Sequence, residues 1–156
     1  MTGPKTNPIA AGLDSALRSL AFQRKKLIWT RELPECWQVV ELQKSEYGQQ
    51  YYLNIGFWLK ALGETESPRE HKCHIRLRAT LLPDGASQLG QLLDLEANPF
   101  PADEYSRRLE GAVRAVVMPL LQNCATLEGM SAEYQRRQLA TALVHKAARA
   151  LLGPES

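Results

Sequence analysis

This sequence lacks both a cysteine pattern typical of disulfide-bonded proteins and long apolar segments. It has three cysteines, Cys36, Cys73 and Cys124, which are few, odd in number and widely spaced, so they do not form a disulfide framework. We therefore expect buried, reduced thiols. No apolar run approaches the roughly 20 residues that a helix needs to cross a bilayer, and the first residues lack the charged-then-apolar pattern of a secretory signal. These absences predict a cytoplasmic protein with no membrane contact.

Neither sign of charge dominates the composition. The 19 Lys and Arg and the 17 Asp and Glu give a formal net charge of +2, which is too small to indicate nucleic acid or an anionic membrane surface. With 44% hydrophobic and 23% charged residues, the chain has the composition of a folded globular protein. Its 156 residues fit one domain, residues 1–156, in which residues 1–6 form a flexible lead.

Motifs for metal and phosphate sites are also missing. No glycine-rich phosphate loop, H-E-x-x-H or G-x-S-x-G motif occurs. His71, Cys73 and His74 form an H-x-C-H segment, but on a strand the first two residues share one face and His74 lies on the other. A tetrahedral zinc site needs further ligands, and the remaining histidine, His145, lies far along the chain. We therefore expect no metal and no cofactor.

Strand-like runs dominate the middle of the sequence. Apolar and polar residues alternate along residues 51–59 and 71–82, which is typical of strands with one buried face. Short connections, and a turn at residues 83–85, favour an antiparallel meander. Residues 89–95 are compatible with a fifth edge strand or with a helical turn. The predicted strands are residues 27–33, 37–43, 51–59 and 71–82.

A helix is predicted before the strands. Asn7 followed by Pro8 indicates its start, because asparagine accepts a free backbone N–H and proline fits the first helical position. Arg24, Lys25 and Lys26 are interpreted as its solvated basic end, where cations suit the negative end of the helix dipole. This interpretation is favoured over a phosphate-binding role for the three residues.

Two further helices are predicted after the strands. One begins at Ala102 and is kinked by Pro119, which lacks a backbone donor, and the last is capped by Ser131. The resulting order is α-β-β-β-β-α-α. It predicts an α+β fold, with an antiparallel four- to five-stranded meander and helices packed on one face of the sheet.

The polar face of the predicted sheet is one candidate site. The alternation directs Cys73, with the apolar residues, toward the helices and leaves charged, amide and aromatic side chains on the opposite face. Such groups could bind an anion or perform acid–base chemistry, with Glu41 or His74 as the base and Arg76 and Arg78 as anion clamps. Ordinary cross-strand pairing is the simpler interpretation. The candidate residues are Glu41, Gln43, Asn54, Trp58, His74, Arg76 and Arg78.

An acidic middle segment is a second candidate. Residues 61–104 hold eight Asp and Glu against four Lys and Arg, and these acids fall in the loops and junctions around the predicted strand 71–82. An acidic rim could steer and hold a basic protein partner, although loops are commonly polar without such a role. The candidate contact residues are Glu64, Glu66, Glu70, Asp94, Glu96, Asp103 and Glu104.

Nucleic acid is not expected as a partner. Arg136, Arg137, Lys146 and Arg149 make the predicted last helix basic, but they scatter around its polar face. Few aromatic residues are available on the sheet for base stacking. A solvated helix explains these charges.

Three segments carry a resemblance to a known family. W-x-V-V-x-L-Q-K-S at residues 37–45, L-N-I-G at residues 53–56 and H-x-C-H-I-R at residues 71–76, followed by a helical tail with L-E-G, resemble a bacterial domain family of unassigned function. The sequence departs from it after the predicted strand 71–82, where residues 89–95 replace a tryptophan-bearing segment. The family brings no established catalytic residues to this chain.

The resemblance implies an interaction protein. Small α+β proteins of this sort often accompany bacterial toxins, so we expect a non-enzymatic immunity protein that binds and neutralises a cognate, basic toxin domain. This implication is a fold-level analogy. The alternative is a small enzyme or anion-binding module that uses the polar sheet face around Glu41, His74 and Arg76.

Overall fold

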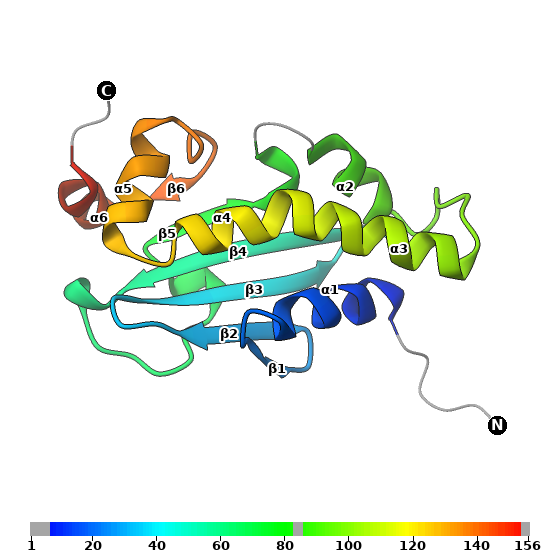
Figure 1. Ribbon diagram of the computed structural model, residues 1–156, viewed down its shortest axis with the longest axis horizontal. Coiled ribbons are helices and arrows are strands. Elements are labelled where there is room, and N and C mark those ends of the chain that lie inside the picture. The colour runs from blue at the N-terminus through cyan, green and yellow to red at the C-terminus, as the bar shows by residue number, and fades with distance from the viewer. Residues whose placement is uncertain (1–6, 83–85, 154–156) are drawn as a thin grey trace.

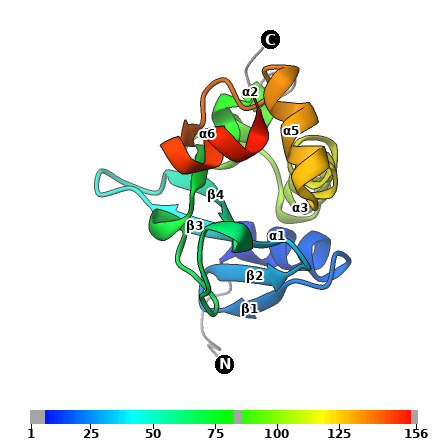
Figure 2. The ribbon, with the colours of Figure 1, turned by 90° about the vertical axis from the view of Figure 1, so that its left-hand side faces the viewer.

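The computed structural model describes residues 7–82 and 86–153. The predicted flexible lead at residues 1–6 and the predicted turn at residues 83–85 lie outside the described residues. Figure 1 shows a sheet with helices laid along one face. In the view turned by 90°, α1 and α3 lie on the same side of β2 and β3 (Figure 2). The α+β class is confirmed.

The centre of the fold is an antiparallel sheet in which each strand pairs with the next strand in sequence. The two longest strands, β3 and β4, have nine residues each and pair along their whole length. Two short strands that the sequence does not reveal extend the predicted meander at its edges. The strands are β1 (Gln23–Lys25), β2 (Ile28–Glu32), β3 (Cys36–Lys44), β4 (Tyr51–Leu59), β5 (Ile75–Arg78) and β6 (Leu143–Val144).

The predicted alternation along β4 is confirmed. Leu53, Ile55, Phe57 and Leu59 are fully buried and belong to the hydrophobic core shared with the helices. Burying such side chains stabilises the fold by roughly 1.5–3 kcal/mol each. The helices are α1 (Pro8–Arg18), α2 (Ala86–Leu92), α3 (Ala102–Ala112), α4 (Met118–Asn123), α5 (Leu127–Gln135) and α6 (Lys146–Leu152).

The first helix begins as predicted but ends earlier. The Asn7 side chain accepts hydrogen bonds from the backbone N–H groups of Ile9 and Ala10, while the chain leaves the helix after Arg18 and passes through Ala21 at a φ of 66°. Residues 24–26 therefore belong to β1 and to the turn that follows it. The interpretation of these residues as a helix end is wrong, because Gln23–Lys25 pair with β2 in a hairpin instead of continuing the helix.

The predicted strand 71–82 is much shorter than the sequence suggests. Only Ile75–Arg78 pairs as β5, and it is flanked by two short 3₁₀ helices, η2 (Glu70–Lys72) and η3 (Ala79–Leu81). Residues 89–95 do not form a strand; most of them continue α2. The predicted apolar and polar faces are correct for the residues that pair in β5. Alternation of side chains does not indicate where strand pairing stops, so the predicted ends of the strand are wrong.

The kink predicted at Pro119 is a π-helical turn. Residues Val113–Val117 are π-helical and connect α3 to α4, which has Pro119 in its first turn. Proline has no N–H to donate and crowds the preceding turn, and a π-bulge is one way for a helix to absorb that disturbance. The apolar stripe nevertheless continues through the turn, since Val113 and Val117 are both buried.

The last part of the chain is not the single helix that was predicted. Helix α5 is capped by Thr126, whose side-chain oxygen accepts from Gly129 N at 3.0 Å. Ser131 lies inside α5, and its hydroxyl donates to the Leu152 carbonyl. The chain then turns at Arg137, which has a φ of 65°, before forming β6 and α6. This turn uses a positive φ at a non-glycine residue, which sequence patterns rarely signal.

A buried amide joins the sheet to α4. Gln38 is fully buried on the helix-facing side of β3, and its Nε2 donates to the Leu121 carbonyl at 2.8 Å and to the Cys124 carbonyl at 3.1 Å. Its Oε1 accepts from Arg31 Nε at 2.9 Å. Since the last carbonyls of a helix have no partner within it, Gln38 satisfies groups that burial would otherwise leave unpaired.

Candidate functional site

The sheet face turned away from the helices carries the polar candidates. Strand register places Glu41 beside Asn54, and Asn54 beside Arg78. In the neighbouring row, Gly56 lies between Val39 and Arg76. Residues directly opposite one another on antiparallel strands share a face, so each row presents its side chains on the side opposite the helical layer.

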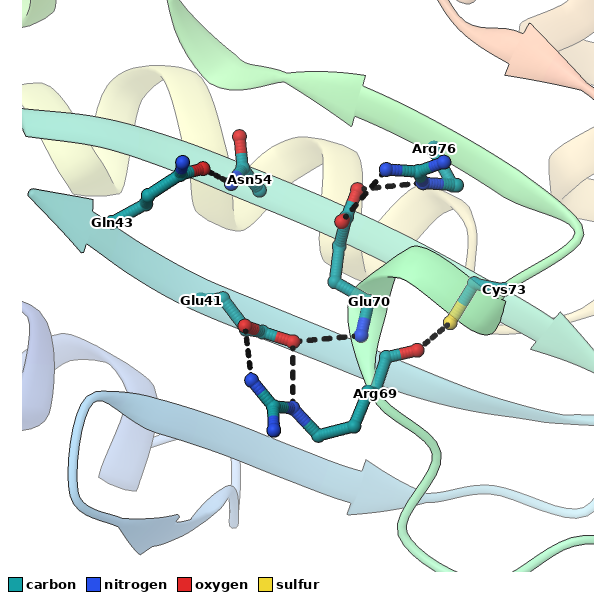
Figure 3. A network of polar contacts seen from close by, with 7 residues as sticks. All are labelled: Glu41, Gln43, Asn54, Arg69, Glu70, Cys73 and Arg76. Atoms are coloured by element: carbon teal, nitrogen blue, oxygen red, sulfur yellow. Dashed lines mark hydrogen bonds and ion pairs between the residues drawn. The ribbon is translucent and has the colours of Figure 1, made fainter. Parts of the chain in front are cut away.

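A short segment folds down onto this face. The clasp, defined here as residues 70–73, comprises η2 and Cys73, and Figure 3 shows it over the strands of the sheet. The residue beneath it is Gly56. A Cβ atom on Gly56 would lie 2.8 Å from Cys73 Sγ and 3.3 Å from Glu70 Cγ. These separations leave no room for a side chain. The glycine of the L-N-I-G segment is therefore the point at which the clasp touches the sheet.

Cys73 is consequently buried on the other side from the one predicted. The strand pattern directed it toward the helices, but it precedes β5 and packs against Gly56 on the polar face. Its Sγ donates to the Arg69 carbonyl at 3.5 Å. Burial, and hence the prediction of a reduced buried thiol, is confirmed for all three cysteines.

Two carboxylates fix the clasp to the sheet. Glu41 accepts hydrogen bonds from Arg69 Nη2 at 3.1 Å, from Arg69 Nε at 3.3 Å and from Glu70 N at 2.7 Å. The Glu70 carboxylate accepts from Arg76 Nε at 3.2 Å. Figure 3 shows the Glu41 carboxylate directed at Arg69 and the Glu70 backbone nitrogen, and the Glu70 carboxylate directed at Arg76. Glu70 was predicted to be an exposed contact residue, but it is buried and already paired with Arg76.

The sheet hollow is a cavity of about 610 Å³ beside the clasp. It brings together five of the seven polar-face candidates, Glu41, Gln43, Asn54, Arg76 and Arg78. The other two, Trp58 and His74, do not line it. Two further lining residues were considered in the sequence in other roles, Glu70 as an acidic contact residue and His71 as a possible metal ligand. No sequence pattern marked the rest as site residues: Arg69, Leu77, Leu81, Thr141 and Leu143.

The electrostatics of the sheet hollow suit binding better than proton transfer. Burial alone would raise the pKa of Glu41, but the hydrogen bonds from Arg69 and from the Glu70 amide, with the Arg69 charge, more than offset it, so the pKa is lowered. Glu41 therefore stays ionised with its oxygens engaged, which makes it a poor general base. Arg78 is exposed, stacks over the Tyr52 ring at 4.0 Å, and has no carboxylate partner among the described residues.

The thiols are not nucleophiles. Burial raises the pKa of Cys36 to about 11 and that of Cys73 to about 12. The pKa of Cys124 is raised as well, again chiefly by burial. A cysteine attacks as its thiolate, so these three side chains act as packing groups at neutral pH.

The two histidines at the far end of β5 form a separate cluster. His74 Nδ1 accepts from Leu59 N at 3.0 Å, and its ring lies 4.3 Å from the Trp58 ring. His145 Nδ1 accepts from Ala147 N at 3.1 Å, which caps α6. The two imidazole centroids are 6.0 Å apart. Both rings thus accept a backbone N–H at Nδ1, and neither ring lines the sheet hollow.

Metal ligands are not gathered in the described part of the chain. Within residues 7–82 and 86–153, no group of three or more His, Cys, Asp and Glu side chains is placed to hold an ion. In the H-x-C-H segment, Cys73 bonds to the Arg69 carbonyl and His74 to the Leu59 amide.

The acidic candidates fall into two groups at opposite ends of β4. Glu64 and Glu66 are exposed in the loop that follows its C-terminal end. Asp94 instead forms a β-bridge with Gln50, directly before the first residue of β4. A nine-residue strand spans about 26 Å at ~3.3 Å per residue. The acids therefore do not form one continuous rim.

Most of the second acidic group has intramolecular partners. Glu96 Oε1 accepts from Gln49 N at 3.2 Å, and Glu104 lies 3.7 Å from Arg108. Asp103 is exposed in the first turn of α3, where a negative charge suits the helix dipole. These contacts are typical of carboxylates that stabilise loops and helix ends.

The first acidic group lines a hollow of its own. This acidic hollow, about 920 Å³ in volume, contains three carboxylates and one cation. Lys60 Nζ pairs with Glu32 at 2.7 Å, whereas Glu64 and Glu66 have no cationic partner in the described residues. Trp37, half-buried, forms part of the wall. The lining residues are Glu32, Trp37, Lys60, Gly63, Glu64, Thr65, Glu66 and Ser67.

The architecture defines an antiparallel α+β protein with polar hollows on its open sheet face. The chain belongs to the family described as Domain of unknown function (DUF4304), which its residues 13–123 match. No curated protein and no solved structure matches it. Across residues 7–82 and 86–153, no helix has the length and apolar character required to cross a membrane.

Replacing Gly56 tests the contact between clasp and sheet. Gly56→Ala should lower the free energy of unfolding by about 1–3 kcal/mol, because the added methyl overlaps the Cys73 thiol. Urea denaturation measures the change. The matched control is Gly111→Ala in α3, where an added Cβ meets nothing within 4 Å and should be neutral or stabilising by up to ~1 kcal/mol. Equal stability of the two variants would contradict the proposed close contact.

The histidine cluster predicts acid sensitivity. Burial, assisted by His145, lowers the pKa of His74 below its ordinary value of about 6.5, so the unfolded chain takes up this proton first. The free energy of unfolding should therefore fall as the pH drops below about 6.5, and level off once folded His74 is protonated. Urea denaturation between pH 7 and pH 5 measures this.

Two variants assign the acid sensitivity to His74. His74→Asn supplies a non-titrating acceptor and should flatten the pH dependence, although losing the ring lowers overall stability. His71→Gln, at an exposed histidine on η2, should retain it. An unchanged slope in His74→Asn would assign the titration to another group.

Proposed function

We propose that this protein is a non-enzymatic protein-binding module, and specifically a bacterial immunity protein that binds and neutralises a cognate toxin domain in the cytoplasm. The observation that supports the proposal is the acidic hollow beside Trp37, where Glu64 and Glu66 have no cationic partner among the described residues. A basic toxin domain is the partner that such a surface would attract. The resemblance to small single-domain toxin partners adds an argument by analogy.

The chemistry of the described side chains favours binding over catalysis. Glu41 and Glu70, the carboxylates closest to the centre of the polar face, are both held by arginines. The cysteines are protonated and buried, and His74 is fixed to the backbone of β4. A catalytic base must reach its substrate with a free lone pair, whereas the two carboxylates and His74 Nδ1 already accept hydrogen bonds from within the chain.

The acidic hollow has the features of an interaction surface. Glu64 and Glu66 are exposed and unpaired within the described chain, and three carboxylates face one cation around the hollow. Trp37 supplies an aromatic wall, and its ring already lies 6.0 Å from Lys60 Nζ. Aromatic residues with nearby charges are enriched among the residues that dominate binding energies, and an arginine or lysine of the partner would find both attractions here.

The proposed contact with the toxin domain therefore includes fewer residues than the acidic segment predicted from the sequence. We assign it to Glu64 and Glu66. Asp94, Glu96 and Glu104 already bond within their own end of the molecule.

Charge reversal in the presence of the partner tests this assignment. The expected partner is the secreted protein encoded by a neighbouring reading frame, and the two should copurify. Glu64→Lys combined with Glu66→Lys should slow association by about tenfold or more at low ionic strength, and flatten its salt dependence, because electrostatic steering is lost. Stopped-flow fluorescence or surface plasmon resonance measures the rate.

The matched control makes the same charge change at the opposite end of β4. Glu46→Lys combined with Asp103→Lys alters two exposed carboxylates and should leave the association rate close to that of the wild type. Equal slowing in both double variants would remove the acidic hollow from the proposal. Absence of any complex with the neighbouring secreted protein would contradict the immunity role itself.

A second candidate function, an anion-binding module, is favoured by Arg78. Its guanidinium faces the sheet hollow without a carboxylate partner in the described chain. Arg78→Gln should then abolish binding of a carboxylate ligand without altering the toxin association rate. An effect on both would place the two functions on one surface.

A further inference from the structure

The hairpin of β1 and β2 forms the wall of a third hollow. This basic hollow, about 470 Å³ in volume, contains four cationic residues, and no carboxylate lines it among the described residues. Its lining residues are Gln23, Arg24, Lys25, Lys26, Ile28, Thr30, Ser67 and Arg69. We propose that the basic hollow binds the phosphate group of a small phosphorylated molecule.

The hairpin and the loop before the clasp meet to form this hollow. On β1 and β2, Lys25 lies opposite Ile28, and Gln23 lies opposite Thr30. Ile28 pairs in turn with Glu41, so these residues belong to the polar sheet face. The second wall is Ser67 and Arg69, which the clasp holds in place. Segments far apart in the sequence therefore enclose one basic space.

Two of the four cations are available to a ligand. Arg69 is engaged by Glu41. The Arg24 guanidinium donates to the Lys26 carbonyl at 2.7 Å and lies 5.1 Å from the centre of the Trp29 ring. Lys25 and Lys26 are exposed and have no carboxylate partner in the described chain. Since like charges gathered at one place repel each other, an anion bound between them would relieve this repulsion.

The remaining lining groups suit a phosphate. The side chains of Gln23, Thr30 and Ser67 supply an amide and two hydroxyls as neutral donors, and none of them bonds to another described side chain. Phosphate oxygens accept several hydrogen bonds at once, and ammonium groups bind them as point charges. Ile28 and the lysine stems offer apolar surface for the organic part of the ligand.

Size and composition favour a small molecule over a nucleic acid. A cavity of about 470 Å³ lies within the ~300–1,000 Å³ typical of small-ligand sites. No aromatic side chain lines the basic hollow among the described residues. Proteins that bind single strands usually stack bases on aromatic rings along the path of the strand.

The test measures the binding of inorganic pyrophosphate, the simplest probe of the phosphate group. Calorimetry and thermal denaturation are carried out at constant ionic strength, with sodium chloride as the reference salt. Wild-type protein should bind pyrophosphate and melt at a higher temperature in its presence. Lys25→Gln combined with Lys26→Gln should weaken binding by about tenfold or more, because two charge-assisted contacts are lost.

The control variant removes two lysines elsewhere. Lys44→Gln combined with Lys146→Gln changes the net charge equally at two exposed positions that line none of the three hollows. It should retain the wild-type affinity for pyrophosphate.

Three results would overturn the proposal. The first is no pyrophosphate binding by the wild-type protein at millimolar concentration and low ionic strength. The second is an equal loss of affinity in the Lys25/Lys26 and Lys44/Lys146 double variants, which would show that the effect depends on net charge alone. The third is tighter binding of a single-stranded oligonucleotide through the same two lysines, which would make a nucleic-acid backbone the occupant.

Discussion

The open face of this sheet depends on one close contact. The backbone of Gly56 lets the clasp approach so closely that Cys73 Sγ occupies the space in which any other residue would have its side chain. The close approach of the clasp allows two ion pairs to form, one between Glu70 and Arg76 and one between Glu41 and Arg69. Arg69, directly before the clasp, lines both the sheet hollow and the basic hollow and thus lies between them. The absence of a side chain at Gly56 thus determines how the clasp is arranged on the polar face of the sheet.

The regular parts of the fold could be predicted because their signals are periodic. Every second residue of β4 from Leu53 to Leu59 is apolar and fully buried, and the Asn7 cap is a local arrangement of neighbouring residues. Strands β1 and β6 have three and two residues, too few for alternation to be recognised. The turns at Lys26 and Arg137 use positive φ values at residues other than glycine, and no composition rule marks such positions.

The candidate sites were predicted in part for a related reason. Strand phase correctly gathered Glu41, Asn54 and Arg78, since register follows from alternation once strands pair. Burial of Glu70 could not be predicted, because it requires knowing that the loop folds back over Gly56. The same is true of His74, whose role is set by a backbone amide of β4 rather than by its neighbours in sequence. The resemblance carried by residues 37–45, 53–56 and 71–76 is an argument for the proposed function only. The contacts of these segments show how the clasp is attached to the sheet.

The outer edge of β5 is covered by residues that lie beyond the region shared with the family. Leu143 and Val144 pair with Arg76 and Ile75, and the family match ends at residue 123. A chain shortened after α4 would therefore leave the backbone groups of β5 free to pair with another molecule. Unprotected strand edges of this kind promote self-association. By covering the edge of β5, the C-terminal segment protects the sheet from pairing with other molecules.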